Sequence, residues 1–490
     1  MNLKLIFISL GLLLTELLTA QDQTTELSLK QVIEIARMES PDAQTARHSF
    51  RSAYWNYKYY RANYLPSLSL TSDPNLNRAI NKITMGDGSV KFVEQNLLNT
   101  DLTLNLSQNL SWTGGSFFLE TSAQRMDLFS EHKYSWQTSP IMIGYRQSLF
   151  GYNSLKWDRR IEPVRYQEAK KSYVETLELV SANAIHKFFA LATAQSDYDI
   201  ASFNYANADT LYRYAQGRYN IGTITENEML QLELNRLTEE TNRMNALIEM
   251  DNCMQELRSY LGIHEDRELR VLVSPQIPDF SVNLNEALAL AYENSPDIQT
   301  MERRKLESES AVAKARANAG LKADIYLRFG LTQTADKLPE AYRNLLDQQY
   351  VSIGISLPIL DWGRGKGQVR VARSNRDLVY TQVEQSRTDF ELNVRKLVKQ
   401  FNLQTQRVRI AARTDETAQR RSEVARKLYL LGKSTILDLN ASISEKDSAR
   451  RNYISALYNY WSLYYTLRSM TLYDFERNTM LTEDYHLLIE

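Results

Sequence analysis

The chain consists of two related halves, and this duplication constrains its fold more than any other sequence feature. The segment Leu29–Asn63 aligns without gaps to Leu284–Asn318, and ten of the 35 paired positions are identical. The two segments of this first alignment are 255 residues apart in the sequence. A later segment, Tyr219–Gly222, aligns with Tyr429–Gly432, and these two are only 210 residues apart. The first half therefore carries an insertion of about 45 residues. A duplication of this kind predicts two copies of one structural unit that bury their apolar faces together.

Each half contains a long stretch without proline that carries a helical pattern. Positions 164–274 and 359–490 contain no proline. Apolar residues recur there at three- and four-residue spacing: Leu177, Val180, Ala184, Phe188 and Leu191 in the first half, and Phe390, Val394, Leu397, Phe401 and Val408 in the second. This spacing predicts helices that pack along a coiled-coil-like seam. The first would run from about Trp157 to Ile221, a length of about 95 Å at 1.5 Å per residue.

The segments between these helices alternate with a period of two. Leu102, Leu104 and Leu106 share one face of Asp101–Leu110, and polar residues occupy the other face. The same alternation recurs in two later segments, at Ile325 and Leu327 and at Val351 and Ile353. Such segments fit the half-buried strands of a soluble sandwich or the lipid-facing strands of a transmembrane barrel. The length of the helices and an export signal favour the barrel.

A barrel has a direct consequence for assembly. Every backbone group inside a bilayer must be hydrogen-bonded, so an open sheet edge is not tolerated there. A chain that supplies only a few strands must therefore close its barrel with copies of itself.

The first 20 residues have the layout of a secretory signal peptide. Lys4 precedes an apolar run from Leu5 to Leu14, and Ala20 provides a small residue at the expected cleavage site. Gln21 follows where a lipidated protein would have a cysteine. We expect an exported protein without an acyl anchor.

The composition excludes several classes of function. A net charge of −1 argues against nucleic-acid binding, and a single cysteine excludes a disulfide framework and any multi-cysteine metal site. The five histidines form no HExxH motif, and no Ser–His–Asp or Cys–His arrangement stands out. Beyond the N-terminus, no stretch is apolar for the 18 or so residues of a membrane helix. The sequence thus predicts neither an enzyme nor a bound cofactor or metal.

Over roughly residues 27–475 the sequence resembles the TolC-like outer-membrane efflux proteins. The resemblance rests on the duplicated helix that leads into Ser40-Pro41-Asp42 and Ser295-Pro296-Asp297, on Leu65-Pro66-Ser67-Leu68, on the strand end Leu357–Gly363, and on Tyr-x-x-Gly in each half. It implies a homotrimer in which each chain gives four strands to one twelve-stranded outer-membrane barrel. The helices would form a long periplasmic tunnel, whose closed tip opens when a periplasmic adaptor and an inner-membrane transporter dock.

The repeats and the resemblance together predict an α+β membrane protein with a defined order of segments. The first repeat is 21–275, with helices at 27–64, strands within 66–150 and tunnel helices at 154–262. The second is 276–475, with a helix at 283–319, strands at 323–331 and 350–359 and tunnel helices at 364–470. A tail, 476–490, follows. We interpret the insertion as an extracellular extension of the strands rather than an additional spanning pair.

The resemblance also assigns roles to individual residues. The tunnel tip and adaptor contact would include Tyr219, Gly222, Thr223, Tyr429, Gly432 and Lys433. The gate would include Asp438 and its first-half counterpart Glu228, with Ser434 where relatives can carry a latching arginine. Lipid would contact Leu102, Leu104, Leu106, Ile325, Leu327, Val351 and Ile353. Threefold symmetry would turn one Asp438 into a ring of three carboxylates that favours cations.

The sequence therefore predicts a passive exit duct of a tripartite efflux or type I secretion system. The duct would lie in the outer membrane of a Gram-negative bacterium, in contact with outer-membrane lipid, with a large periplasmic portion. The alternative from another class is an exported, non-porous coiled-coil scaffold with a small β-sandwich.

Overall fold

The structure is a computed structural model that describes residues 25–264, 268–431 and 433–489. The predicted signal peptide and Gly432 lie outside the described residues. The chain divides into two compact units, and each unit takes segments from both sequence repeats. We call residues Ser52–Glu168 and Gln299–Arg387 the strand unit. The described residues up to Arg51, of Ala169–Ile298 and from Thr388 onward form the helical unit.

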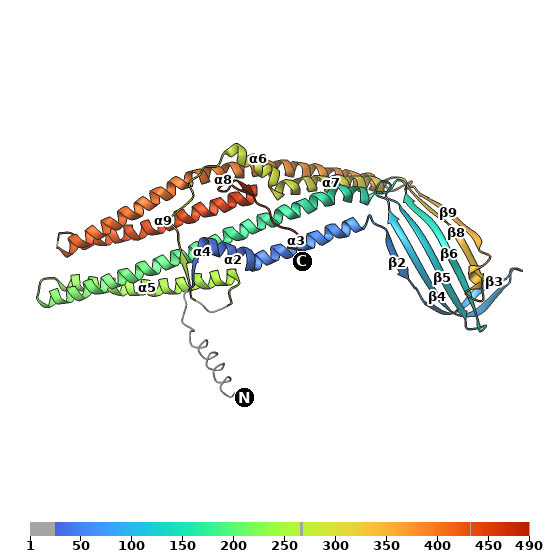
Figure 1. Ribbon diagram of the computed structural model, residues 1–490, viewed down its shortest axis with the longest axis horizontal. Coiled ribbons are helices and arrows are strands. Elements are labelled where there is room, and N and C mark those ends of the chain that lie inside the picture. Colours follow the sequence, from blue (N-terminus) through green and yellow to red (C-terminus); the bar gives the residue numbers. More distant parts are fainter. Residues whose placement is uncertain (1–24, 265–267, 432, 490) are drawn as a thin grey trace, which may run out of the picture. The chain divides into compact units, whose positions relative to one another are not determined.

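Long helices dominate the helical unit, where α4 lies beside α5 and α8 beside α9 (Figure 1). The α-helices of the described residues are α2 (Leu29–Glu39), α3 (Pro41–Ala62), α4 (Ser154–Asn220), α5 (Glu226–Leu261), α6 (Leu284–Asn294), α7 (Pro296–Ala319), α8 (Arg364–Leu430) and α9 (Ile436–Thr471). The expected helix from Trp157 to Ile221 is thus confirmed as α4. None of the described helices is both long enough and apolar enough to cross a lipid bilayer.

The prediction of a single helix at 283–319 is wrong, and the prediction of more than one helix within 27–64 is confirmed. Both segments break in the same way. Each is two helices that meet at a Ser-Pro step, α2 with α3 and α6 with α7. Ser40 and Ser295 have extended backbone angles, with ψ of 146° and 137°. The residue before a proline is driven out of the helical region, and proline then starts the next helix. The first segment also begins as a strand, β1 (Thr25–Ser28), which pairs in parallel with β7 (Leu269–Leu272).

The predicted seam residues form the core of the helical unit. Phe188, Leu191 and Ala184 are fully buried on α4, and Val394 and Phe401 are fully buried on α8. Phe401 stacks on Tyr464 of α9, with ring centroids 5.9 Å apart. The helical period of the sequence is therefore confirmed by burial along both long helices.

The strand unit contains one antiparallel sheet, drawn as neighbouring arrows in Figure 1. Its order is β2 (Ser67–Thr71), β4 (Val90–Asn109), β5 (Ser116–Leu128), β6 (Lys133–Ser148), β8 (Lys322–Ala335) and β9 (Leu346–Ser356). β3 (Asn75–Thr84) pairs with the first half of β4 and continues the edge begun by β2. The strand predicted at 350–359 begins four residues earlier and ends before Pro358, which cannot donate to a ladder.

The insertion forms a hairpin whose position contradicts the predicted extracellular extension. Its strands β4 and β5 meet at a turn around Trp112–Gly115. Asn109 Nδ2 donates to the carbonyl of Asn63, just after α3, at 3.0 Å. Asn153 Nδ2, just before α4, donates to the carbonyl of Ser111 at 3.0 Å. The turn therefore lies at the helix end of the sheet, and the hairpin runs along the whole sheet instead of extending its far end.

Candidate functional site

The tip of the first helical hairpin, between α4 and α5, is a tight turn closed by its own backbone. Gly222 has φ of +70°, the left-handed conformation that glycine adopts at the least cost. Its N–H donates to the carbonyl of Tyr219 at 2.8 Å, and the N–H of Thr223 donates to the carbonyl of Arg218 at 2.9 Å. The expected helix reversal at Gly222 is confirmed. Tyr219 is 38% exposed at this turn.

The tip of the second hairpin, between α8 and α9, repeats this geometry in its described residues. The N–H of Lys433 donates to the carbonyl of Leu428 at 2.9 Å, as Thr223 does to Arg218. Tyr429 lies one residue before the end of α8 and lines the same groove as Leu211 of α4. Burial raises the pKa of the Tyr429 hydroxyl; the nearby charges of Arg218 and Glu228 act in opposite directions. Within the helical unit, the two predicted tips therefore lie close to one another.

Glu228 and Asp438 occupy equivalent positions, each the third residue of the helix that leaves a tip. Thr225 caps α5 and Thr435 caps α9, and both caps form a reciprocal box with these carboxylates. Asp438 Oδ2 accepts from Thr435 Oγ1 at 2.7 Å and from Ser434 Oγ at 3.4 Å. The hydrogen bond from the Thr435 side chain lowers the pKa of Asp438, so its carboxylate is ionised at neutral pH. Asp438 is thus both a helix cap and an exposed negative charge.

Farther from the tips, polar side chains connect the two hairpins. Arg451 Nε on α9 lies 2.7 Å from Asp197 Oδ1 on α4. Asn204 Nδ2 on α4 donates to Asp447 Oδ2 on α9 at 2.9 Å. Nearby, Lys446 Nζ lies 4.9 Å from the ring centroid of Phe203. These contacts join helices from different repeats, so any separation of the hairpins must break them.

A groove of about 1050 Å³ runs beside these contacts, between α4, α8 and α9. Both charged and apolar side chains line it, among them Phe203, Leu211, Arg426, Tyr429 and Leu439. Near its edge, Arg450 Nη1 lies 3.1 Å from Asp415 Oδ2, and Asp415 is only 6% exposed. The groove thus has both apolar contacts and fixed charges on its walls.

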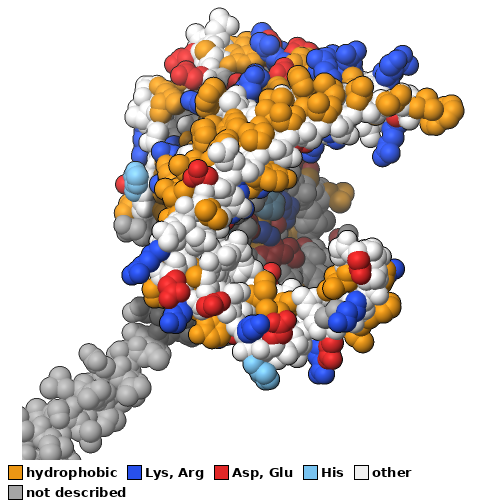
Figure 2. All heavy atoms as spheres, turned by 90° about the vertical axis from the view of Figure 1, so that its right-hand side faces the viewer, with side chains coloured by type: hydrophobic (Ala, Val, Ile, Leu, Met, Phe, Trp, Pro, Cys, Tyr) orange, Lys and Arg blue, Asp and Glu red, His pale blue; other side chains and the backbone are white. Residues whose placement is uncertain are grey.

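The two faces of the sheet differ in chemistry. The register pairs Leu106 with Leu119, Leu119 with Ile143 and Ile143 with Phe329, so one face is apolar across neighbouring strands. All seven predicted lipid-facing residues lie on this face: Leu102, Leu104, Leu106, Ile325, Leu327, Val351 and Ile353. Leu102, Val351 and Ile353 are 51%, 58% and 62% exposed. Figure 2 shows the molecule from the right-hand side of Figure 1, where the sheet is drawn. In this view hydrophobic side chains form a band that charged side chains interrupt.

The opposite face of the sheet is polar and contains an ion pair. Arg328 Nη2 of β8 lies 3.2 Å from Glu120 Oε1 of β5 and thereby reaches across β6. Phe118 of β5 stacks on Tyr326 of β8, with ring centroids 5.9 Å apart. Gly144 of β6 lies beneath the Phe118 ring and leaves no room for a side chain. A sheet with one apolar and one polar face suits a barrel with lipid outside and water inside.

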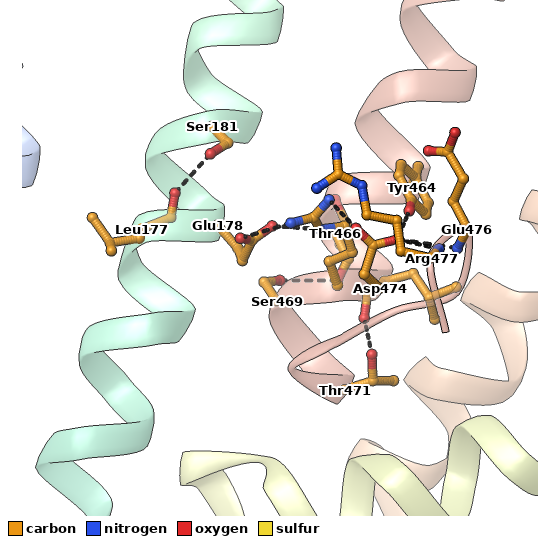
Figure 3. A network of polar contacts seen from close by, with 12 residues as sticks. Leu177, Glu178, Ser181, Tyr464, Thr466, Ser469, Thr471, Asp474, Glu476 and Arg477 are labelled. Atoms are coloured by element: carbon orange, nitrogen blue, oxygen red, sulfur yellow. Dashed lines mark hydrogen bonds and ion pairs between the residues drawn. The ribbon is translucent and has the colours of Figure 1, made fainter. Parts of the chain in front are cut away.

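A buried ion-pair network in the helical unit was not predicted from the sequence. Glu178 of α4 is fully buried, and Arg37 Nη1 and Arg468 Nε lie 2.6 and 2.8 Å from its carboxylate oxygens. Arg468 also reaches Asp474 at 3.1 Å, and Tyr464 donates to the same carboxylate (Figure 3). Burial opposes ionisation of Asp474, but these partners outweigh it and lower its pKa. The network fastens the segment after α9 to α2 and α4.

The C-terminal tail takes part in this arrangement. Arg37 Nη2 lies 2.7 Å from Glu483, and the ring of Tyr485 packs against Phe50 with centroids 5.2 Å apart. One sequence signal pointed to the network: Glu178 is an acid next to Leu177 within an apolar seam. Among the described residues, no group of three His, Cys, Asp or Glu side chains is arranged to hold a metal ion.

Comparisons with known proteins agree with this geometry. Residues 287–471 match the family model described as outer membrane efflux protein. Over 451 residues the chain is 24% identical to the toxin and drug export protein A of Aggregatibacter actinomycetemcomitans, covering 86% of this chain and 94% of that protein.

Solved structures share the fold at low sequence identity. The Campylobacter jejuni CmeC outer membrane channel superimposes with a TM-score of 0.67 at 15% identity, covering 94% of this chain and 88% of that one. The outer membrane protein VceC from Vibrio cholerae gives a TM-score of 0.62 at 14% identity, covering 90% and 95%. This chain thus shares the fold of these outer membrane channels.

Proposed function

Since the chain belongs to the TolC-like outer membrane efflux protein family, we propose that it is the outer-membrane exit duct of a tripartite efflux or type I secretion system. The observation that carries this proposal is the two-faced sheet, apolar on one side and polar on the other, connected to long paired helices. An apolar exterior fits lipid, and a polar interior fits a water-filled passage.

The duct is a homotrimer in this proposal. The sheet of one chain ends in two unpaired edges, β2 with β3 on one side and β9 on the other. Neither edge is tolerated in lipid, whereas β9 of one chain can close on β2 of the next. A cyclic assembly of identical chains satisfies both edges with a single kind of interface.

The helical tips are the docking end of the duct. In this proposal a periplasmic adaptor contacts the two tips and an inner-membrane transporter supplies the energy. The Aggregatibacter actinomycetemcomitans relative is a toxin and drug export protein, which fits a duct within an export system. Cargo moves passively through the duct, and the polar contacts between α4 and α9 resist opening until the adaptor binds.

Asp438 sets the ionic preference of the tip. Three copies of its exposed carboxylate around the passage attract cations and repel anions. The test is the Asp438→Gln variant, studied in planar bilayers under a salt gradient. In α2, Gln31 is the third residue of the helix and completes the capping box with Ser28. Glutamine at position 438, the third residue of α9, should therefore keep the cap while it removes the charge.

The matched control is Glu228→Gln, which makes the same chemical change in the equivalent box of α5. We expect cation-over-anion permeability to fall severalfold in Asp438→Gln and to fall less in Glu228→Gln. Equal selectivity of Asp438→Gln and wild type would reject the gate role. A purified protein that conducts no current and stays soluble without detergent would instead support the scaffold function.

A further inference from the structure

The strand unit supplies more strands than the resemblance implies. Residues 52–168 and 299–387 are all described, and they form six antiparallel strands side by side, with β3 continuing the edge formed by β2. From this we propose that the assembled barrel has eighteen strands, six from each of three chains, and an exit wider than a twelve-stranded barrel provides. The proposal rests on the proposed trimeric duct.

The first support is that the inserted hairpin β4–β5 spans the same height as its neighbours. At the helix end, Gln108 Nε2 donates to the carbonyl of Tyr64, between α3 and β2, at 2.9 Å. Gln147 Nε2, near the end of β6, donates to the carbonyl of Thr113 in the hairpin turn at 2.9 Å. The turn of the β4–β5 hairpin therefore lies level with the beginning of β2 and the end of β6.

The second support is that the inserted strands continue both faces of the sheet. Leu104 of β4 lies opposite Leu70 of β2, and Leu119 of β5 lies opposite Ile143 of β6. The apolar face thus continues over the insertion, interrupted by Thr121 opposite Leu104, as a lipid-facing band requires. On the polar face, the ion pair between Glu120 and Arg328 joins β5 to β8. An extracellular hairpin would expose these leucines to water for no gain.

The third support is the width of the helices that enter the sheet. Within the strand unit, the chain passes from α3 to β2, from β6 to α4, from α7 to β8 and from β9 to α8. Four helices packed about 9.5 Å apart occupy about 38 Å of arc. Six strands about 4.8 Å apart and tilted by about 40° occupy about 38 Å, whereas four occupy about 25 Å. Six strands can therefore close above the four helices that each chain supplies.

The same spacing gives the size of the opening. Eighteen strands close at a backbone diameter of about 36 Å, against about 24 Å for twelve strands. Barrels of 16 to 18 strands in porins leave an aqueous channel. The exit of this duct is therefore wide enough to pass cargo bulkier than a small drug, such as a polypeptide segment.

Disulfide mapping in the outer membrane tests the strand order. In a Cys253→Ser background, the pair Ser67→Cys/Ser107→Cys joins β2 to β4, where the two native hydroxyl oxygens are 2.8 Å apart. The matched control is Ser67→Cys/Arg146→Cys, which would join β2 to β6. Two intervening strands and an offset of two residues along β6 place those positions about 16 Å apart, beyond the reach of a disulfide. If the hairpin lay outside the barrel, β2 would pair with β6 and the control would bridge.

A third set of variants maps the seam between chains. Ser69→Cys on β2 is combined in turn with Gln348→Cys, Tyr350→Cys and Ser352→Cys on β9. We expect oxidant to bridge the 67/107 pair within one chain, to leave 67/146 unbridged, and to join three chains through one β2–β9 pair. Bridging of 67/146 in a trimer overturns the eighteen-stranded barrel and leaves the proposed function standing. A monomeric particle without any bridge between chains contradicts both.

Discussion

Two acids on α4, three residues apart, should respond in opposite ways to the same substitution. Glu178 is fully buried between Arg37 and Arg468, at 2.6 and 2.8 Å. Glu175→Gln is the control for Glu178→Gln, because burial and the negative charge of Asp297 raise the pKa of Glu175 to about 7. Glu178 thus stabilises the fold as an anion, whereas ionised Glu175 destabilises it.

The loss of unfolding free energy expected for Glu178→Gln depends on the partners that remain to the two arginines. Removing one member of a buried ion pair costs about 3 to 5 kcal/mol because the other charge is left uncompensated. After Glu178→Gln, Arg37 keeps Glu483 at 2.7 Å and Arg468 keeps Asp474 at 3.1 Å. The loss should therefore lie near the lower limit, at about 3 kcal/mol.

The assay is unfolding of the detergent-extracted protein in denaturant, followed by the helical circular dichroism signal at pH 8. We expect a lower midpoint for Glu178→Gln and a higher midpoint for Glu175→Gln. Equal midpoints for Glu178→Gln and wild type would refute the reasoning, since the network would then add nothing to the packing of α4. A loss of similar size in Glu175→Gln would refute it as well.

Three further predictions concern pH and glycine positions. The pKa of Glu175 is raised in the folded state from its ordinary value of 4.5 to about 7, so the wild-type protein regains stability as the pH falls from 7 to 4.5. In the same denaturant assay, Glu175→Gln should therefore be more stable than wild type by about 2 kcal/mol at pH 8, a value already reduced for partial exposure of the carboxylate. At pH 4.5 the two proteins should differ by nearly nothing. Gly222→Ala places a side chain at φ of +70° in open space, so it should cost only about 1 kcal/mol and show as faster hydrogen exchange confined to the first tip. Gly144→Val drives a side chain into the Phe118 ring and should lower the yield of folded barrel in the outer membrane, and Phe118→Ala in the same chain should restore it, as measured by heat-modifiable migration on gels.

The long helices could be predicted because one physical pattern determines them over many turns. The spacing of Phe188 and Leu191 on α4 and of Val394 and Phe401 on α8 gave the buried face, and the structure buries all four. The break at Pro296, within the single helix predicted at 283–319, was missed because helical periodicity continues across a single extended residue. The alternation around Leu104 predicted a strand and its apolar face correctly.

The position of the insertion could not be predicted from the same pattern. A lipid-facing strand and an exposed strand both alternate, so the period does not give the height of the hairpin. That height depends on contacts such as Asn109 with Asn63, which join positions 46 residues apart. The Glu178 network was missed for the same reason, since its partners Arg37 and Arg468 lie 141 and 290 residues away in sequence.

For the residues of the tips, the sequence predicts the local structure well but not the function. Their local geometry, the turn at Gly222 and the capping boxes of Glu228 and Asp438, depends on a few neighbouring residues and follows closely from the sequence. Their role in gating depends on other copies of the chain and on the adaptor, so the selectivity of Asp438→Gln is the measurement that tests it.

The mass of the native particle extracted from membranes with detergent tests the central claim most directly. One full chain has a mass of 56.7 kDa. A shared barrel predicts a protein mass close to three mature chains, because only a closed ring pairs β9 with the β2 edge. A monomer that stays in solution without detergent would contradict the shared barrel, and with it the exit duct.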